Sequence, residues 1–175
     1  PHLSTRHAAT DPDGFSKGLD WGFRLCLLIG LPACAGLILC AEPLMATLFQ
    51  YRNFTAMDAK MSSWSLIAQS TAVPAFLLVK VLAPAFYARQ DTRTPVKAAI
   101  AAVLTNAICT VGLFAWLLHA TPTGQAALQA AGGSWRQALA GIPGAHALLA
   151  LAIAIAGWVN ALQLAWLLRQ AGVYR

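Results

Sequence analysis

Residues 98–118 read AAIAAVLTNAICTVGLFAWLL, a run that contains no charged residue. An α-helix needs about 20 predominantly apolar residues to cross a hydrocarbon core of roughly 30 Å. Lipid offers the backbone no hydrogen-bond partners, so a segment that crosses it has to be helical. The stretch therefore predicts a transmembrane helix and makes the bilayer the natural solvent for the rest of the chain.

Three further segments are nearly as apolar. They are residues 25–48, 64–87 and 145–168. The first carries Glu42 and Pro43 near one end, and the second is interrupted by one charge, Lys80. Each is long enough to cross a bilayer as a helix. We therefore predict an all-α membrane protein with four transmembrane helices.

The composition excludes most classes of soluble protein. The chain is 58% hydrophobic and 10% charged, whereas a soluble domain carries about 25% charged residues. The net charge is +6, but the basic residues stand in short clusters beside apolar runs, a pattern that membrane topology explains. Nothing resembles a groove-reading helix or an RNA-stacking motif, so we expect no nucleic-acid partner.

The segments between the predicted helices differ in their content of Lys and Arg. One set holds eight: Arg6, Lys17, Arg24, Arg89, Arg93, Lys97, Arg169 and Arg175. The other set holds three: Arg52, Lys60 and Arg136. Because loops rich in Lys and Arg stay in the cytoplasm, the first set is predicted to be cytoplasmic and the second periplasmic. The cytoplasmic segments are 1–24, 88–97 and 169–175, and the periplasmic segments are 49–63 and 119–144.

Both periplasmic segments are predicted to contain short helices. Thr55–Asp58 reads T-x-x-D, close to a capping box, which predicts a helix start there. Gly132-Gly133 divides the loop 119–144 into two short amphipathic pieces.

The acidic residues do not form a catalytic or metal-binding pair within a span. All six lie in loops or at the ends of predicted helices: Asp11, Asp13, Asp20, Glu42, Asp58 and Asp91. There is no nucleophile elbow, no HExxH and no Gly-rich phosphate loop. The four cysteines lack the spacing of a zinc site or a disulfide framework. We assign no catalytic residue, no metal and no cofactor, and expect no enzymatic activity.

Lys80 is the most informative single residue. A lysine at the centre of a spanning helix costs about 2.5–3.5 kcal/mol, so it normally faces a cavity, a partner or the interface. Lys80 precedes Tyr87 by seven residues, about 10 Å along a helix. Two interpretations stay open: a cation that meets an anionic substrate in a cavity, or an anchor whose long side chain reaches the membrane surface.

The connection after Lys80 has its own pattern. Pro84 removes a helix hydrogen bond and permits a kink, and Pro95 suits the first turn of the next helix. Asp91 is placed to pair with Arg89 or Arg93 and hold a tight connection. A gate that moves as one unit and an ordinary charged hairpin both fit these residues.

Amide side chains occur within the apolar third and fourth predicted helices. They are Asn106, Asn160 and Gln163, and the last two stand three apart on one helical face. Hydrogen bonding between helices is the favoured interpretation, and contact with a substrate is the alternative. Trp158 lies in the middle of its span, where it is expected to pack against a neighbouring helix.

Four stretches together resemble one family of membrane proteins. They are LDWGFRL (19–25), LFQYRNFTAMD (48–58), KVLAPAFYARQDTRTPVK (80–97), and NALQLAWLLR (160–169) followed by GVY (172–174). In this order and at these places relative to the spans, they are similar to the MurJ/MviN lipid II flippases of bacteria. The resemblance covers most of the chain, and 80–97 is its most specific part. One departure is the loop 121–144, which is longer than expected for the family.

The resemblance implies a fourteen-helix, two-lobed transporter of the multidrug/oligosaccharidyl-lipid/polysaccharide exporter superfamily, multi-pass in the bacterial inner membrane. Such proteins translocate lipid II, the undecaprenyl-pyrophosphate-linked peptidoglycan precursor, by alternating access. The chain begins without an initiator Met and stops just beyond an apolar run, so we expect an internal fragment equivalent to the ninth to twelfth helices. Its expected partners are lipid II, membrane lipids and the remaining helices.

A pyrophosphate head requires fixed cations in a cavity of low dielectric constant. Within this chain the candidates implied by the resemblance are Lys80, Arg24 and Arg52. Rival functions are export of another lipid-linked sugar or a drug by a related transporter, and a non-transporting scaffold for cell-wall assembly. A membrane-embedded enzyme would need a converging set of acids or histidines inside the spans, and the sequence shows no such set.

Overall fold

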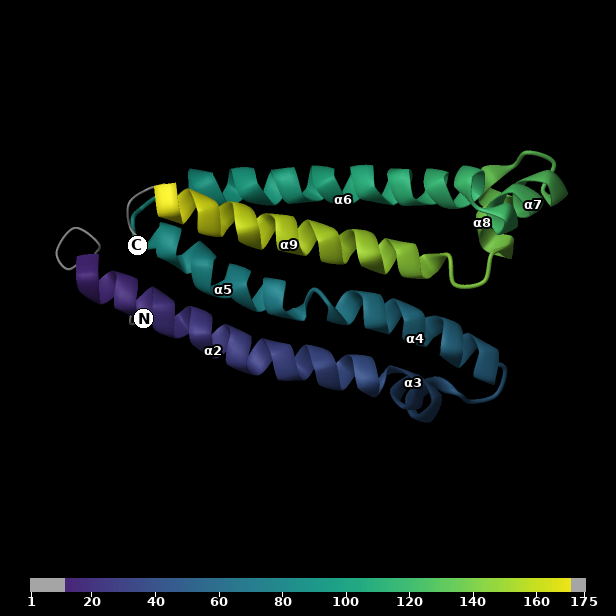
Figure 1. The fold of residues 1–175 in the computed structure, drawn as a ribbon, viewed down its shortest axis with the longest axis horizontal. Helices are drawn as coiled ribbons and strands as arrows, with labels where there is room; N and C mark the ends of the chain where they lie inside the picture. The colour runs from purple at the N-terminus through teal and green to yellow at the C-terminus, as the bar shows by residue number, and fades with distance from the viewer. Residues whose placement is uncertain (1–11, 171–175) are drawn as a thin grey trace.

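A computed structural model describes residues 12–170, and the regular elements within them are α-helices (Figure 1). Four helical rods are long and apolar enough to cross a membrane: Ser16–Leu39, Ala56–Tyr87, Arg93–Ala120 and His146–Gln170. This confirms the predicted all-α membrane fold with four spanning helices. Arg6 and Arg175, which entered the topology prediction, lie outside the described residues.

The first rod ends at Leu39, where a turn leads into a separate short helix. Helix α2 spans Pro12–Leu39, and a short helix, α3, spans Ala41–Phe49 after a turn at Cys40. Pro43 has no N–H to donate to the carbonyl of Leu39, and its ring crowds that carbonyl. The predicted range 25–48 is therefore divided between two helices, and α2 begins well before residue 25.

The second rod is interrupted at its middle. Helix α4 spans Ala56–Ser70 and helix α5 spans Val73–Tyr87. Pro74 stands in the first turn of α5, where it supplies no N–H for the carbonyl of Ser70. The same chemistry that ends α2 thus ends α4, halfway along the rod Ala56–Tyr87 and well inside the predicted span 64–87.

Helix α4 begins with the capping box that its sequence predicts. The amide of Thr55 donates to Asp58 Oδ2 at 2.9 Å, and the amide of Asp58 donates to Thr55 Oγ1 at 3.2 Å. Two of the free N–H groups at the helix start are satisfied in this way. The capping box therefore fixes where α4 begins.

Helix α6 spans Arg93–Ala120 and leads into a compact helical hairpin. Helix α7 spans Pro122–Ala130, and helix α8 spans Trp135–Gly141. Gly132 and Gly133 lie between α7 and α8 with φ of 58° and 84°, a left-handed conformation that favours glycine. The hairpin leads to helix α9, His146–Gln170.

The rods α6, α9, α4–α5 and α2 follow one another across Figure 1. We call the end that carries α3, α7 and α8 the distal end, and the end where α5 joins α6 the proximal end. Helix α9 packs against α4, α5 and α6, and α2 packs against α5. The main core lies among α2, α5 and α9 and contains Leu19, Ala75, Leu78, Leu82, Ala85, Phe86, Ala161, Leu164 and Leu168.

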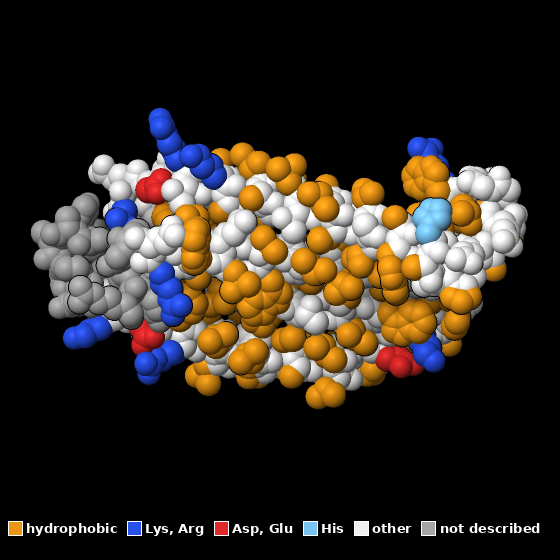
Figure 2. Space-filling view, turned by 45° about the horizontal axis from the view of Figure 1, so that its top comes forward, with side chains coloured by type: hydrophobic (Ala, Val, Ile, Leu, Met, Phe, Trp, Pro, Cys, Tyr) orange, Lys and Arg blue, Asp and Glu red, His pale blue; other side chains and the backbone are white. Residues whose placement is uncertain are grey.

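The surface has the pattern of a protein immersed in lipid. Figure 2 shows the charged side chains gathered toward the two ends, with a broad hydrophobic belt between them. Large apolar side chains on the outermost helices are open, such as Leu28 on α2 and Ile108 on α6, which are 72% and 71% exposed. Exposed apolar area on this scale indicates lipid or further helices as neighbours, and the chain is a multi-pass membrane protein.

Candidate functional site

Lys80 lies on the side of α5 that faces away from the packed core. Leu78 and Leu82, two residues before and after it, are buried, whereas Lys80 is exposed. Two residues correspond to about 200° of rotation around an α-helix. The ammonium group therefore stands on an open side of the segment.

A contact between α5 and α9 identifies that side. The ring of Phe76 lies against Gly157, with Cε1 only 2.9 Å from the position that a Cβ would take. Helices α5 and α9 run in the same direction, from the distal to the proximal end. Lys80 follows Phe76 by one turn, and Asn160 follows Gly157 by about one turn. Lys80 and Asn160 thus lie on the same side of the segment and at a similar depth.

Three amide oxygens near this side have no hydrogen-bond partner within residues 12–170. They are Asn106 Oδ1, Asn160 Oδ1 and Gln163 Oε1, and all three are buried. Asn106 follows the buried Ala98 and Ala102 at helical spacing, so it faces α9, against which α6 packs. The interhelical hydrogen bonds expected from the sequence are not formed at these oxygens. They remain available as acceptors.

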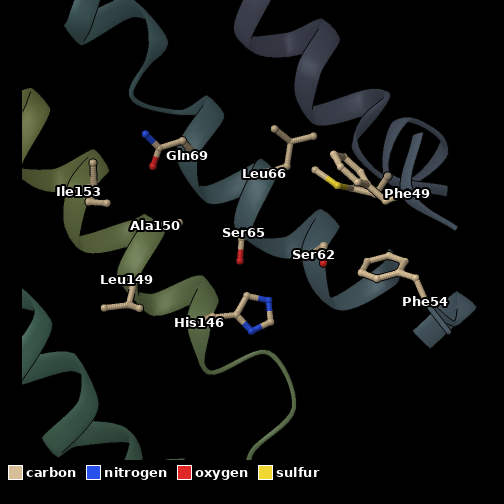
Figure 3. A pocket seen from close by; sticks show the side chains of 11 residues that line it. Phe49, Phe54, Ser62, Ser65, Leu66, Gln69, His146, Leu149, Ala150 and Ile153 are labelled. Atoms are coloured by element: carbon tan, nitrogen blue, oxygen red, sulfur yellow. The ribbon is translucent and has the colours of Figure 1, made fainter. Parts of the chain in front are cut away.

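A cavity of about 590 Å³ lies closer to the distal end, between α3, α4 and α9. Figure 3 shows the side chains of Ser65 and His146 pointing into the same space between α4 and α9. Ser65 Oγ is buried without a partner in the described chain. His146 Nε2 lies 3.2 Å from the carbonyl oxygen of Met61. The cavity is mainly apolar, with a few polar groups on its α4 wall.

The cavity and Lys80 open on the same side of the segment. Ile153 lines the cavity and stands one turn before Gly157, where Phe76 packs. Gln69 lines the cavity at its proximal end, next to the break in the second rod. We call Ser65, Gln69, Lys80 and Asn160 the polar face.

The opposite side of α9 is apolar by comparison. Leu162 and Trp166 are 62% and 58% exposed there, about 200° and 240° around the helix from Asn160. They line a second hollow of about 560 Å³ together with Phe23 and Leu82, and Arg169 stands at its proximal end. At mid-depth, α9 therefore presents the Asn160 amide on one side and apolar side chains on the other.

The other two candidate cations do not lie beside Lys80. Arg24 forms an ion pair with Asp20, with Nε 2.8 Å from Oδ2. Gly22 and Cys26 face α5, so Arg24, two residues from each, points away from it. Arg52 lies in the turn at the distal end, exposed and with φ of 51°. The structure does not bring the three candidates together.

The connection between α5 and α6 is held by hydrogen bonds from backbone amides to the side chain of Asp91. Asp91 Oδ1 accepts from the amides of Arg93 and Thr94, each at 3.1 Å. Hydrogen bonding from Thr94, with smaller contributions from the Arg93 amide and the charge of Arg89, lowers the pKa of the Asp91 carboxyl. The predicted ion pair of Asp91 with an arginine does not form within residues 12–170. Asp91 instead caps the start of α6.

The two prolines of this region behave differently from each other. Pro84 lies inside α5, and the helix continues through it to Tyr87. Pro84 has no N–H for the carbonyl of Lys80, so that carbonyl loses its helical donor on the exposed side. Pro95 lies in the first turn of α6, where its missing N–H costs nothing.

Sequence reasoning missed Ser65, Gln69 and His146. The signal was present: Ser62, Ser65 and Gln69 recur at helical spacing within an apolar segment. No group of three or more His, Cys, Asp or Glu side chains placed to bind a metal ion is found among residues 12–170. What the polar face offers is one cation, hydroxyl and amide groups, and an apolar cavity beside them.

Comparison with known proteins gives this geometry a context. The whole chain, residues 1–175, matches the sequence model of the family described as lipid II flippase MurJ. A Vibrio cholerae protein named "Probable lipid II flippase MurJ" is 42% identical over 116 residues, which cover 66% of this chain and 22% of that protein.

Two further relatives carry names of the same family. The Haemophilus influenzae protein of the same name is 39% identical over 112 residues, covering 61% of this chain and 22% of the relative. The Burkholderia cenocepacia protein named "Lipid II flippase MurJ" is 40% identical over 106 residues, covering 61% and 20%. The chain thus matches between 20% and 22% of the length of these relatives.

Proposed function

The chain belongs to the MurJ family of lipid II flippases, and we propose that it supplies four spanning helices to a protein that translocates lipid II across the bacterial inner membrane. In this proposal the complete protein has fourteen helices in two lobes, and the chain forms part of the second lobe. The proximal end is cytoplasmic and the distal end periplasmic. The lipid is moved by alternating access without a chemical change.

The observation that carries this proposal is the position of Lys80. Its charge stands on the polar face, part-way along a spanning rod, instead of packing into the core. A cation in a cavity of low dielectric constant attracts the pyrophosphate of a lipid-linked precursor more strongly than it would in water. Seryl and amide groups on the same face suit the hydroxyl and amide groups of a sugar–peptide head.

The apolar cavity adds a second feature of an amphiphile pathway. Phe49, Phe54 and Leu66 line it beside the polar groups of α4. A lipid-linked sugar needs polar and apolar surface side by side, because its head and its chain travel together. An exporter of another lipid-linked sugar or of a drug would use the same kind of surface, and this is the nearest alternative.

Depletion of the full-length protein in bacteria tests the proposal. Lipid II synthesis should continue while its head becomes inaccessible to a probe that labels the outer leaflet. Restoring the protein should restore labelling. Normal outer-leaflet labelling during depletion would exclude the flippase function and favour the alternatives.

A further inference from the structure

The break in the second rod is enclosed by the neighbouring helices. Ser70 is 1% exposed, and Ala72 and Ala75 are completely buried. Broken helices in membrane proteins leave backbone polar groups that other groups must satisfy. The break therefore has to be compensated by side chains that pack around it.

Two glycines make room for it, one from each adjacent helix. Gly30 of α2 lies against Pro74, whose Cα is 3.2 Å from the position of a Cβ on that glycine. Gly157 of α9 lies against Phe76, with the corresponding distance 2.9 Å. Larger residues at either glycine would collide with the start of α5. The break is thus held between α2 and α9.

Side-chain groups satisfy several carbonyls around the break. Ser70 Oγ donates to the Leu66 carbonyl at 2.6 Å, and Thr71 Oγ1 donates to the Ala68 carbonyl at 2.7 Å. These bonds are local to α4. One bond crosses to another rod: the indole Nε1 of Trp158 on α9 donates to the carbonyl of Thr71 at 2.9 Å.

The two halves of the rod have different neighbours. Helix α4 packs mainly against α3 and α9, whereas α5 packs mainly against α2 and α9. Pro74 has no N–H for the carbonyl of Ser70, and the helical ladder is interrupted there, so bending is favoured at the break. In secondary transporters, discontinuous helices of this kind lie at the site around which the helix bundles move.

We propose that residues 70–74 are a hinge between α4 and α5, and that the Trp158 indole is a latch that holds the hinge in the setting seen here. Releasing the latch breaks one hydrogen bond and leaves the hydroxyl bonds within α4 in place. The two halves then adopt a second angle. This inference goes beyond transport of lipid II, because it concerns the helices and not their cargo.

Spin-label distances in the full-length protein, reconstituted without substrate, test the hinge. Nitroxides are attached through p-acetylphenylalanine at Met57 and Tyr87, which are 53% and 52% exposed at the two ends of the rod. A straight rod would separate them by about 45 Å. Using this chemistry leaves the native cysteines in place.

The variant Trp158→Phe keeps the ring and removes the donor. The ratio of molecules with a second label-to-label distance to molecules with the first should rise roughly 3-fold. It should rise by no more than roughly 20-fold, the range expected for one hydrogen bond between membrane helices. Trp166→Phe on the same helix is the matched control, because Trp166 is 58% exposed, and it should leave the distances unchanged. If the indole only stabilises the fold, Trp158→Phe should lower the melting temperature and leave a single, unchanged distance between the labels. That result would overturn the latch.

A second variant keeps the hinge testable if Trp158→Phe does not fold. Pro74→Ala restores an N–H at the break and is smaller than proline, so it fits beside Gly30. The two labels should then show a single distance, longer than in the unmodified protein, because the rod can now form one continuous helix. Distances identical to those of the unmodified protein would show that the break is no hinge.

Discussion

Lys80 connects the sequence to the proposed function at the scale of a single residue. A lysine within a span carries a cost of about 2.5–3.5 kcal/mol on insertion scales, so it normally meets a water-filled space, a partner or the interface. The structure leaves it exposed on the polar face and away from the core. Snorkelling toward the proximal surface is the competing explanation, and the two explanations predict different variants to fail.

The variant Lys80→Met should lower lipid II translocation by the full-length protein about ten-fold or more. This is the effect expected from the loss of one charge-assisted hydrogen bond. Lys80→Arg should retain activity if only an anchoring charge is needed. Lys97→Met is the control, because Lys97 is an exposed cation of the first turns of α6, outside the polar face. Outer-leaflet labelling of lipid II in complemented cells measures all three. Full activity of Lys80→Met would remove Lys80 from the substrate pathway.

At the scale of elements, caps and prolines decide where the helices begin and end. The apolar runs predicted the four rods, and the T-x-x-D pattern predicted the start of α4. The breaks at Cys40 and Thr71 were not predicted, because hydropathy does not distinguish a continuous helix from two helices end to end. Pro43 and Pro74 mark both breaks, yet Pro84 leaves α5 continuous. Neighbouring packing, which sequence does not contain, decides between these outcomes.

Asp91 provides a prediction at this scale. Asp91→Ala removes the acceptor for the amides of Arg93 and Thr94, so the first turn of α6 should exchange its amide hydrogens several-fold faster. Asp91→Asn keeps an acceptor oxygen, so its amide exchange rate should lie between the rates of Asp91→Ala and the unmodified protein. Hydrogen-exchange mass spectrometry of peptides that cover 92–98 measures the difference. Equal exchange in all three proteins would mean that the cap contributes nothing.

The effect of Asp91 depends on pH in a defined direction. Its carboxyl pKa is lowered from the ordinary value of 3.8, so the folded state favours the ionised form. The stabilisation is therefore complete above 3.8 and is lost as the pH falls through the lowered value. Melting curves should show that the difference between the unmodified protein and Asp91→Asn shrinks only in that acidic range. A difference that shrinks between pH 5 and 7 would contradict this assignment.

At the scale of the whole molecule, the polar face emerges only when the rods are assembled. The sequence located Lys80 and Asn160 but contained nothing to show that they share a side, which follows from the contact of Phe76 with Gly157. The reverse holds for Arg24 and Arg52, which the resemblance grouped with Lys80 and the fold separates. Residues on different helices can be grouped only through packing.

The topology of the rods is a prediction for the whole molecule. Cysteines introduced in place of Arg93, in the first turn of α6, and Ser134, between α7 and α8, should be labelled from opposite sides of the membrane in intact cells and spheroplasts. The excess of Lys and Arg at the proximal end predicts that position 93 lies in the cytoplasm. Labelling of both positions by the same impermeant reagent from one side would refute the four-span threading.

Photocrosslinking in the full-length protein tests the central claim most directly. A benzoylphenylalanine residue at position 80 stands on the polar face, and one at Leu162 stands on the opposite side of α9. If the polar face lines the translocation pathway, lipid II should crosslink from position 80, and only bulk phospholipid should crosslink from position 162. Lipid II captured from position 162 and absent from position 80 would contradict the account.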